Sequence, residues 1–141
     1  LFSAEPCAGS WGILDVIPKM LSHEQNEDLV RLPSLEEVQG VVFAMDGESA
    51  GGPDGFTGKF FTFAWDVVAK DVYEAVASFF CGAGVPKSIT STLIVLIPKV
   101  GAPQDFSQFR SISLCNFINK VLSNVLAGRL AKVLPCFISP Q

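Results

Sequence analysis

The chain has 141 residues and a formal net charge of −4 at pH 7, and its length suits one domain or a piece of a larger protein. Hydrophobic residues make up 49% of it and include 12 phenylalanines, which argues against a disordered chain. Four cysteines without a C-x-x-C pair and a single histidine offer neither a zinc site nor a disulfide framework. The sequence shows no leader and no apolar run of membrane-spanning length, so we expect an intracellular protein, cytoplasmic or nuclear.

The net charge hides an asymmetry between the two parts of the chain. Residues 1–84 carry four basic residues against 13 carboxylates, a balance of −9, whereas residues 85–141 carry six against one, a balance of +5. The overall negative charge argues against a free-standing nucleic-acid-binding protein. A polyanionic partner is expected to meet the C-terminal part.

The first 33 residues carry weak structural signals, and we expect an irregular lead-in there. An apolar pattern over residues 13–21 is interrupted by Pro18, which cannot continue a helix. The polar run of residues 22–29 could form a short helix with an acidic start.

Two stronger helical signals follow. Ser34 and Glu37 form an S-x-x-E capping box, and apolar residues at helical spacing accompany it: Leu35, Val38, Val42 and Met45. Residues 57–80 are rich in aromatic side chains and contain a second apolar stripe: Val68, Val72, Ala75, Val76 and Phe79. Aromatic side chains beside a nucleic-acid site could stack on bases, but core packing is the simpler use.

Between these helical stretches lies the run Gly51-Gly52-Pro53-Asp54-Gly55. Pro53 and Asp54 suit the centre of a tight turn, and Gly55 suits its exit. The paired glycines let the backbone pass close to something, either another segment or a phosphate. No G-K-[ST] follows, so this is not a Walker loop, and an ordinary surface turn is the simplest interpretation.

Residues 92–116 predict a β-hairpin. Leu93 to Ile97 is an unbroken β-favouring apolar run that ends at Pro98. Turn-forming residues follow it, and residues 109–114 resume an extended pattern. Lys99 leaves the first strand and Arg110 enters the second. A Lys and an Arg on neighbouring strands make a good phosphate clamp, with the Arg giving a bidentate contact; two solvated charges on an ordinary hairpin are the alternative.

A last helix is expected after the hairpin. Asn116 or Asn119 can cap it, and it runs to Leu134 with a continuous apolar side. We expect Lys120 and Arg129 to point away from that apolar side.

The run LIPKV, then FR-x-ISLCN, then NKVLSNVLAGRLAKVLP resembles the reverse transcriptase of plant non-LTR (LINE-type) retrotransposons. Upstream, SAGGPDGFTGKFFTFAWDVVAKDV resembles the segment that precedes the fingers in that family, so the resemblance covers residues 33–141. It implies an α+β fold: a helix-rich fragment with one β-hairpin, equivalent to the fingers of a right-hand polymerase. Its implied parts are a lead-in (1–33), an upstream helical segment (34–91), and the fingers hairpin with the following helix (92–141).

The resemblance also implies roles for particular residues. Lys99 and Arg110 occupy the positions that face the triphosphate of the incoming nucleotide. The turn residues that would lie near the template are Gly52, Pro53, Asp54 and Gly55. Further candidates for contacts with the template backbone, which position a strand without reading its sequence, are Lys120, Arg129 and Lys132; ordinary surface charges on a helix explain these three residues equally well.

The catalytic chemistry of that family is missing from this chain. Template-directed polymerisation uses divalent ions held by carboxylates, and the sequence contains no adjacent pair of aspartates. The family places its catalytic motifs downstream, so we expect no catalytic or metal-binding residue here and no activity from the chain alone. Mg²⁺ is expected for the complete domain, with an RNA template, a DNA primer, a dNTP and the palm and thumb of the same polypeptide as partners.

The chain departs from the family at some positions, and two other readings stay open. Ser111 stands where the family usually has Pro, and Asn124 stands where Lys or Arg is common. Such changes would suit a non-catalytic remnant or a domesticated RNA-binding or structural protein derived from an element of this kind. A generic α+β interaction module is the third reading.

Overall fold

The computed structural model describes residues 21–136, which form an α+β arrangement of helices and one two-stranded antiparallel sheet. The elements are α1 (His23–Val30), α2 (Leu35–Ala44), α3 (Gly58–Phe63), α4 (Trp65–Phe80), α5 (Lys87–Thr90), β1 (Thr92–Pro98), β2 (Phe109–Cys115) and α6 (Phe117–Val133), with 3-10 turns at Phe106–Gln108 and Leu134–Cys136. The predicted class, helix-rich with one β-hairpin, is confirmed for these residues. The apolar pattern around Pro18 lies outside them.

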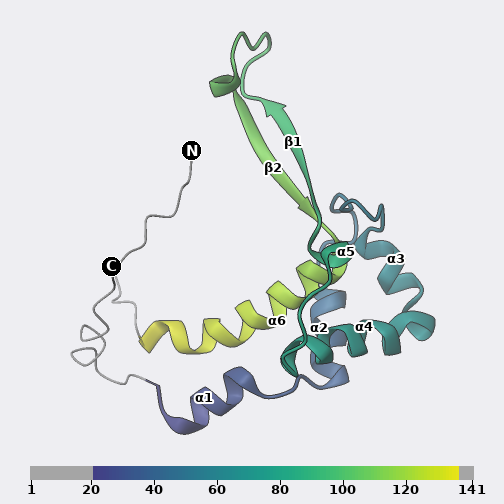
Figure 1. The fold of residues 1–141 in the computed structure, drawn as a ribbon, viewed down its shortest axis with the longest axis vertical. Helices are drawn as coiled ribbons and strands as arrows, with labels where there is room; N and C mark the ends of the chain where they lie inside the picture. The colour runs from purple at the N-terminus through teal and green to yellow at the C-terminus, as the bar shows by residue number, and fades with distance from the viewer. Residues whose placement is uncertain (1–20, 137–141) are drawn as a thin grey trace.

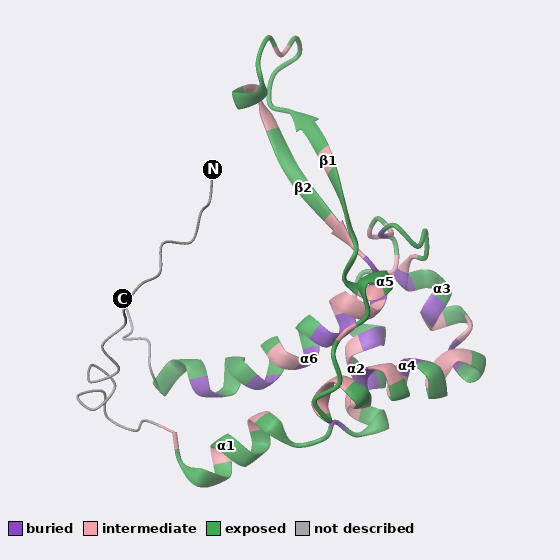
Figure 2. Cartoon of the chain, viewed as in Figure 1, coloured by how far each residue is buried: buried purple, intermediate pink, exposed green. Residues whose placement is uncertain are grey.

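The helices form one body and the hairpin projects from it (Figure 1). The long helix α6 packs against α1, α2 and α4, while the two strands contact each other far more than they contact any helix within residues 21–136. Figure 2 shows the same division, because buried residues gather on the helices, whereas the two strands are mostly exposed and contain no buried residue. The core therefore belongs to the helical body alone.

Valines and aromatic side chains make up that core. Val38 and Val42 of α2 are fully buried, and the ring of Phe61 stacks on that of Phe117 with centroids 4.2 Å apart. The other buried hydrophobic residues are Trp65, Val72, Val76, Val121, Leu122, Val125 and Val133. The predicted stripe of residues 57–80 is thus used for packing through its central members, although Ala64 divides that stretch into α3 and α4.

The helix starts follow the predicted capping chemistry with one difference. Ser22 and Gln25 form a full capping box at α1, which makes residues 23–30 helical within a segment that we expected to be mostly irregular. At α2 the Ser34 hydroxyl accepts the backbone N–H of Glu37 at 3.2 Å. The return bond of the predicted box is not made, because the Glu37 carboxylate turns toward two arginines instead.

The predicted hairpin is confirmed, with β1 and β2 antiparallel. The register runs from the Thr92–Cys115 pair at the base to the Pro98–Phe109 pair near the tip. At the tip Asp105 caps the 3-10 turn by accepting the backbone N–H of Ser107 at 2.8 Å. Local turn chemistry therefore closes the hairpin.

The position of Pro98 follows from the ladder. The backbone N–H of Lys99 donates to the carbonyl of Gln108 at 2.7 Å, so these opposed residues form a hydrogen-bonded pair. Hydrogen-bonded and non-hydrogen-bonded pairs alternate along an antiparallel ladder. Pro98, one residue earlier, falls in a non-hydrogen-bonded pair, so its missing N–H costs the ladder no bond.

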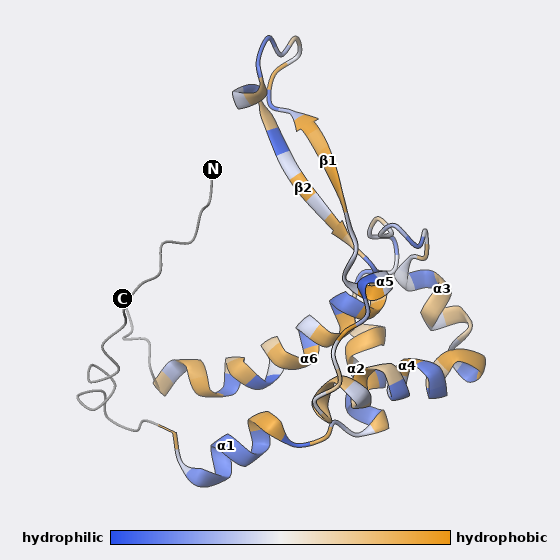
Figure 3. Ribbon diagram, in the orientation of Figure 1, coloured by the Kyte–Doolittle hydropathy of each residue, from blue (hydrophilic) through white to orange (hydrophobic). Residues whose placement is uncertain are grey.

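The hairpin is apolar although it is exposed. Leu93, Ile94, Leu96 and Ile97 of β1 are between 42% and 64% exposed, and Figure 3 shows β1 as one hydrophobic strand. An isolated two-stranded ribbon is only marginally stable in water. The hairpin therefore receives little support from the burial of its own apolar side chains.

A search of residues 21–136 for a membrane-crossing helix, one with both the length and the apolar character required, found none.

We expect two Gly→Ala changes to act in opposite directions on stability. Gly128 lies inside α6 and an added Cβ would meet open space, so Gly128→Ala should raise the free energy of unfolding by about 0.5–1 kcal/mol. Gly82 follows α4 with φ +86°, so Gly82→Ala should lower the free energy of unfolding by about 1 kcal/mol. Urea unfolding followed by circular dichroism measures both, and equal shifts of one sign would contradict the assignment.

Candidate functional site

The register places Lys99 and Arg110 on one face of the hairpin. Arg110 lies directly opposite Ile97, and residues opposite one another share a face. Side chains on a strand return to the same face every second residue, so Lys99 lies on the face of Ile97. The two cations are therefore diagonal neighbours across the strand pair, which is the placement that a phosphate clamp needs.

That face, which we call the cationic face, has an apolar base and a charged end. Its apolar members run from Leu93 and Leu114 at the base, through Val95 and Ile112, to Ile97, which lies opposite Arg110. The opposite face carries Ser111 and Ser113 among its apolar side chains. Neither strand contains an acidic residue, so no carboxylate from the ladder competes for the two cations.

Lys99 and Arg110 differ in how they are held. The Lys99 ammonium donates to the carbonyl of Ser107 at 2.7 Å, which orders it against the turn. Arg110 is exposed, and within residues 21–136 its guanidinium enters none of the ion pairs. One cation is thus fixed, and the other is available to a ligand.

The glycine-rich run forms the predicted tight turn. The Gly55 N–H donates to the Gly52 carbonyl at 3.0 Å, and Gly55 has φ +75°, a value that favours glycine. Asp54 accepts the backbone N–H of Phe56 at 3.2 Å. The turn is therefore built from local bonds with Pro53 and Asp54 at its centre.

This turn packs against the start of α6. A Cβ on Gly52 would lie 2.4 Å from the backbone nitrogen of Asn116, so only glycine fits there. Lys120 of α6 donates to the carbonyl of Ala50 at 2.8 Å. The close approach allowed by the paired glycines is thus made to another segment of the chain. Lys120 and the turn lie together, whereas Lys99 and Arg110 lie toward the far end of the hairpin (Figure 1).

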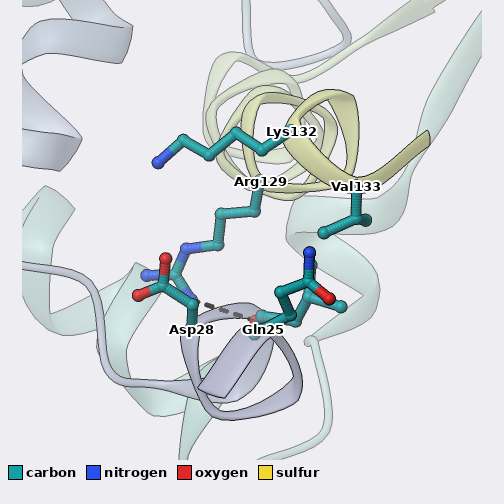
Figure 4. A pocket seen from close by; sticks show the side chains of 6 residues that line it. Gln25, Asp28, Arg129, Lys132 and Val133 are labelled. Carbon is teal, nitrogen blue, oxygen red and sulfur yellow. Dashed lines mark hydrogen bonds between the residues drawn. The ribbon is translucent and has the colours of Figure 1, made fainter. Parts of the chain in front are cut away.

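Arg129 does not point away from the apolar side of α6, as we expected, but is buried with 4% exposure. Its Nε and Nη2 donate to the Glu37 carboxylate at 2.9 and 3.0 Å. Its Nη1 donates to the carbonyls of Leu29 and Arg31 at 3.1 and 2.6 Å. Figure 4 shows the side chain reaching from α6 toward α1, beside Asp28.

Those contacts leave Arg129 no free edge for a template phosphate. The guanidinium also lies over the Phe80 ring, 4.7 Å from its centroid, as in a cation–π contact. The pocket beside it, lined by Gln25, Asp28, Lys132 and others, has a volume of only ≈ 90 Å³. Arg129 therefore joins α6 to α1 and α2, and its guanidinium is not available to a template.

Asn116 is the residue whose role the sequence did not reveal. It occupies the predicted N-cap position of α6, but its side chain makes no capping bond. Instead the buried amide accepts the backbone N–H of Asp54 at 3.2 Å and donates to the carbonyl of Ser88. No local pattern signals such bonds, because their partners lie 62 and 28 residues away.

No cluster of three or more His, Cys, Asp or Glu residues suited to a metal ion occurs in the part of the chain that the structure describes.

The ladder predicts that proline is tolerated at position 111. Ser111 faces Leu96 in a non-hydrogen-bonded pair, so Ser111→Pro should preserve the hairpin, with its cross-strand nuclear Overhauser effects retained. Ile112 faces Val95 in a hydrogen-bonded pair, so Ile112→Pro should remove a ladder bond and lose those signals. Loss of the hairpin in both variants would show that the assignment of hydrogen-bonded and non-hydrogen-bonded pairs is wrong.

The Glu37–Arg129 tie predicts a pH dependence. The hydrogen bond from Arg129 is the largest cause that lowers the pKa of Glu37 below its ordinary value of 4.5. A depressed pKa gives stability that is present above the unfolded value and is lost as the pH falls through the folded value. The free energy of unfolding should therefore fall below about pH 4.5, and Glu37→Gln should flatten that slope. Urea unfolding at a series of pH values around 4.5 measures this free energy of unfolding, and Glu48→Gln, at an exposed position, serves as the control.

Comparison with known proteins finds a relative among transposon proteins. No protein-family model matches the chain. It is 28% identical, over an alignment of 146 residues, to a Xenopus laevis protein described as "Transposon TX1 uncharacterized 149 kDa protein". The alignment covers 100% of this chain and 11% of that protein, so the chain spans about a tenth of the relative's length. The similarity supports a transposon-derived sequence.

Proposed function

We propose that this chain is part of a reverse transcriptase of a non-LTR retrotransposon and that it contributes contacts to the incoming nucleotide and the template. The observation that carries the proposal is the placement of Lys99 and Arg110 on one face of the hairpin. The match of the whole chain to a transposon protein supports the same origin. The hairpin with α6 would then correspond to the fingers.

The chemistry of the cationic face suits a triphosphate. Arginine can grip two phosphate oxygens with its planar fork, and lysine adds a point charge. Arg110 is the available fork, and Lys99 is already ordered beside it. The apolar base of the face, at Val95 and Ile112, would offer a surface for an uncharged group such as a base. A triphosphate needs fixed cations rather than acids, and both strands lack acids.

The turn and Lys120 form the proposed template-proximal surface. Gly52, Pro53, Asp54 and Gly55 lie against the start of α6, and Lys120 is bonded to Ala50 within the same surface. Contacts from such a surface to the sugar-phosphate backbone of a template would position the strand without reading its sequence. Catalysis would require carboxylates and Mg²⁺ from a palm elsewhere in the polypeptide. No step of the reaction is assigned to the residues described here.

Removal of both cations tests the proposal. Titration of the chain with a deoxynucleoside triphosphate at low salt, followed by amide chemical shifts, should perturb β1 and β2. The double variant Lys99→Ala/Arg110→Ala should bind at least about tenfold more weakly, since two charge-assisted contacts are lost. The control is Lys59→Ala/Lys70→Ala, which removes the same charge from exposed positions on the helical body.

Equal affinities in the two double variants would refute the phosphate role. Perturbation of the hairpin by single-stranded RNA but not by the triphosphate would instead favour the alternative of a domesticated RNA-binding protein derived from such an element. A reading frame continuing past the codon for Gln141 into Tyr/Phe-x-Asp-Asp would support the polymerase assignment, and unrelated sequence there would count against it.

A further inference from the structure

The hairpin joins the helical body through two short connections. On one side β2 is followed by a single residue, Asn116, before α6 begins. On the other side only Ser91 separates α5 from β1. Since the strands make few contacts with the helices within residues 21–136, the direction of the hairpin must be set at these two connections.

One side chain ties both connections together. The Asn116 amide is buried, with 4% of the residue exposed. Its nitrogen donates to the carbonyl of Ser88 in α5, on the side where β1 begins. Its oxygen accepts the N–H of Asp54, in the glycine-rich turn. Asn116 therefore links the β2–α6 junction, the α5–β1 junction and the turn.

The bridge requires an amide. A bridge of this kind needs one donor and one acceptor on the same short side chain, which Asn supplies. Aspartate has only acceptors when it is ionised, and would face the Ser88 carbonyl with a negative charge. Serine, threonine or aspartate would serve as well or nearly as well for capping a helix, but the Asn116 side chain makes no capping bond.

The glycine-rich turn packs directly against the backbone of the β2–α6 junction. A Cβ at Gly52 would lie 2.4 Å from the Asn116 nitrogen and 2.5 Å from the Cys115 carbonyl carbon. Because these are backbone atoms, no flexible side chain can move aside. The Gly52 contact and the Asn116–Asp54 hydrogen bond thus hold the turn against the β2–α6 junction in two ways, one steric and one polar, and the Asn116–Ser88 bond adds the α5–β1 junction.

We propose that Asn116 is a positioning residue that fixes the direction of the hairpin over the helical body. It thereby holds the cationic face in a set orientation to the turn at residues 51–55 and to Lys120. A template strand and the nucleotide paired with it can then meet the two surfaces together without a further free-energy cost of orienting the hairpin. This last step rests on the proposed nucleotide contact, whereas the orientation of the hairpin does not.

Distances between spin labels test the orientation. One label occupies the exposed native Cys81, and the other follows Gln104→Cys at the hairpin end, in a background with Cys7→Ser, Cys115→Ser and Cys136→Ser. With Asn116 intact, the distance distribution should be narrow. Asn116→Ala and Asn116→Asp should broaden it, and Gly52→Ala should broaden or shift it, at unchanged helix content by circular dichroism.

Two matched variants serve as controls. Gly84→Ala places a Cβ in open space, and Asn119→Ala removes an amide one turn into α6. Both should leave the distribution unchanged. If Asn116→Ala lowers the unfolding midpoint but keeps the narrow distribution, Asn116 serves stability only and the proposal is overturned.

Triphosphate titration in the presence of a single-stranded template oligonucleotide supplies the second readout, because only a nucleotide and template that together meet both surfaces depend on the direction of the hairpin. If the bound orientation falls to about one fifth of the population in Asn116→Ala, the apparent affinity should weaken about fivefold although Lys99 and Arg110 are retained. A broadened distribution with unchanged affinity would overturn the link between orientation and binding. If the parent chain binds no triphosphate, the proposed function fails, and the label distances alone decide whether Asn116 orients the hairpin.

Discussion

The close contact between Gly52 and the backbone of Asn116 is the constraint on which the arrangement of this chain depends. It leaves room for a hydrogen and for nothing larger. A second close approach lies beside it, because a Cβ on Gly58 would come within 3.2 Å of the Phe117 ring. The segment from the turn to α3 therefore wraps closely around the first turn of α6. The hairpin takes its direction from that same point.

At the other end of α6, the buried guanidinium of Arg129 holds this helix against its neighbours. It joins α6 to the Glu37 side chain of α2 and to carbonyls at the end of α1. A buried charge is costly unless it is paired and its donors are satisfied, and here four hydrogen bonds and an aromatic face meet that requirement. This changes the meaning of the charge asymmetry in the sequence. One of the basic residues that suggested a polyanion-binding helix stabilises the helical body instead.

The sequence predicted those structural features whose interactions join residues close together in the chain. The hairpin, the Pro53–Asp54 turn and the starts of α1 and α2 follow from residues within a few positions of one another. Arg129 and Asn116 were misjudged because their partners lie far away in sequence, up to 100 residues for Arg129. Spacing along α6 showed which positions share a face but not that a charged residue on that face would find a carboxylate. The common face of Lys99 and Arg110 was not predicted, because it depends on the strand register, which the apolar pattern of the two strands does not determine.

That register is held at the two ends of the hairpin rather than along its length. A slip of one residue would move Arg110 to the face opposite Lys99, since side chains alternate between faces. Along β1 the apolar residues point to both sides and are exposed on both, so burial does little to oppose such a slip. At the tip, the Lys99–Gln108 backbone bond, the Lys99–Ser107 bond and the Asp105 cap oppose it. At the base, Asn116 can occupy its site only when β2 ends at Cys115. The cationic face thus depends on polar contacts at both ends of a ribbon whose apolar middle would accept another alignment.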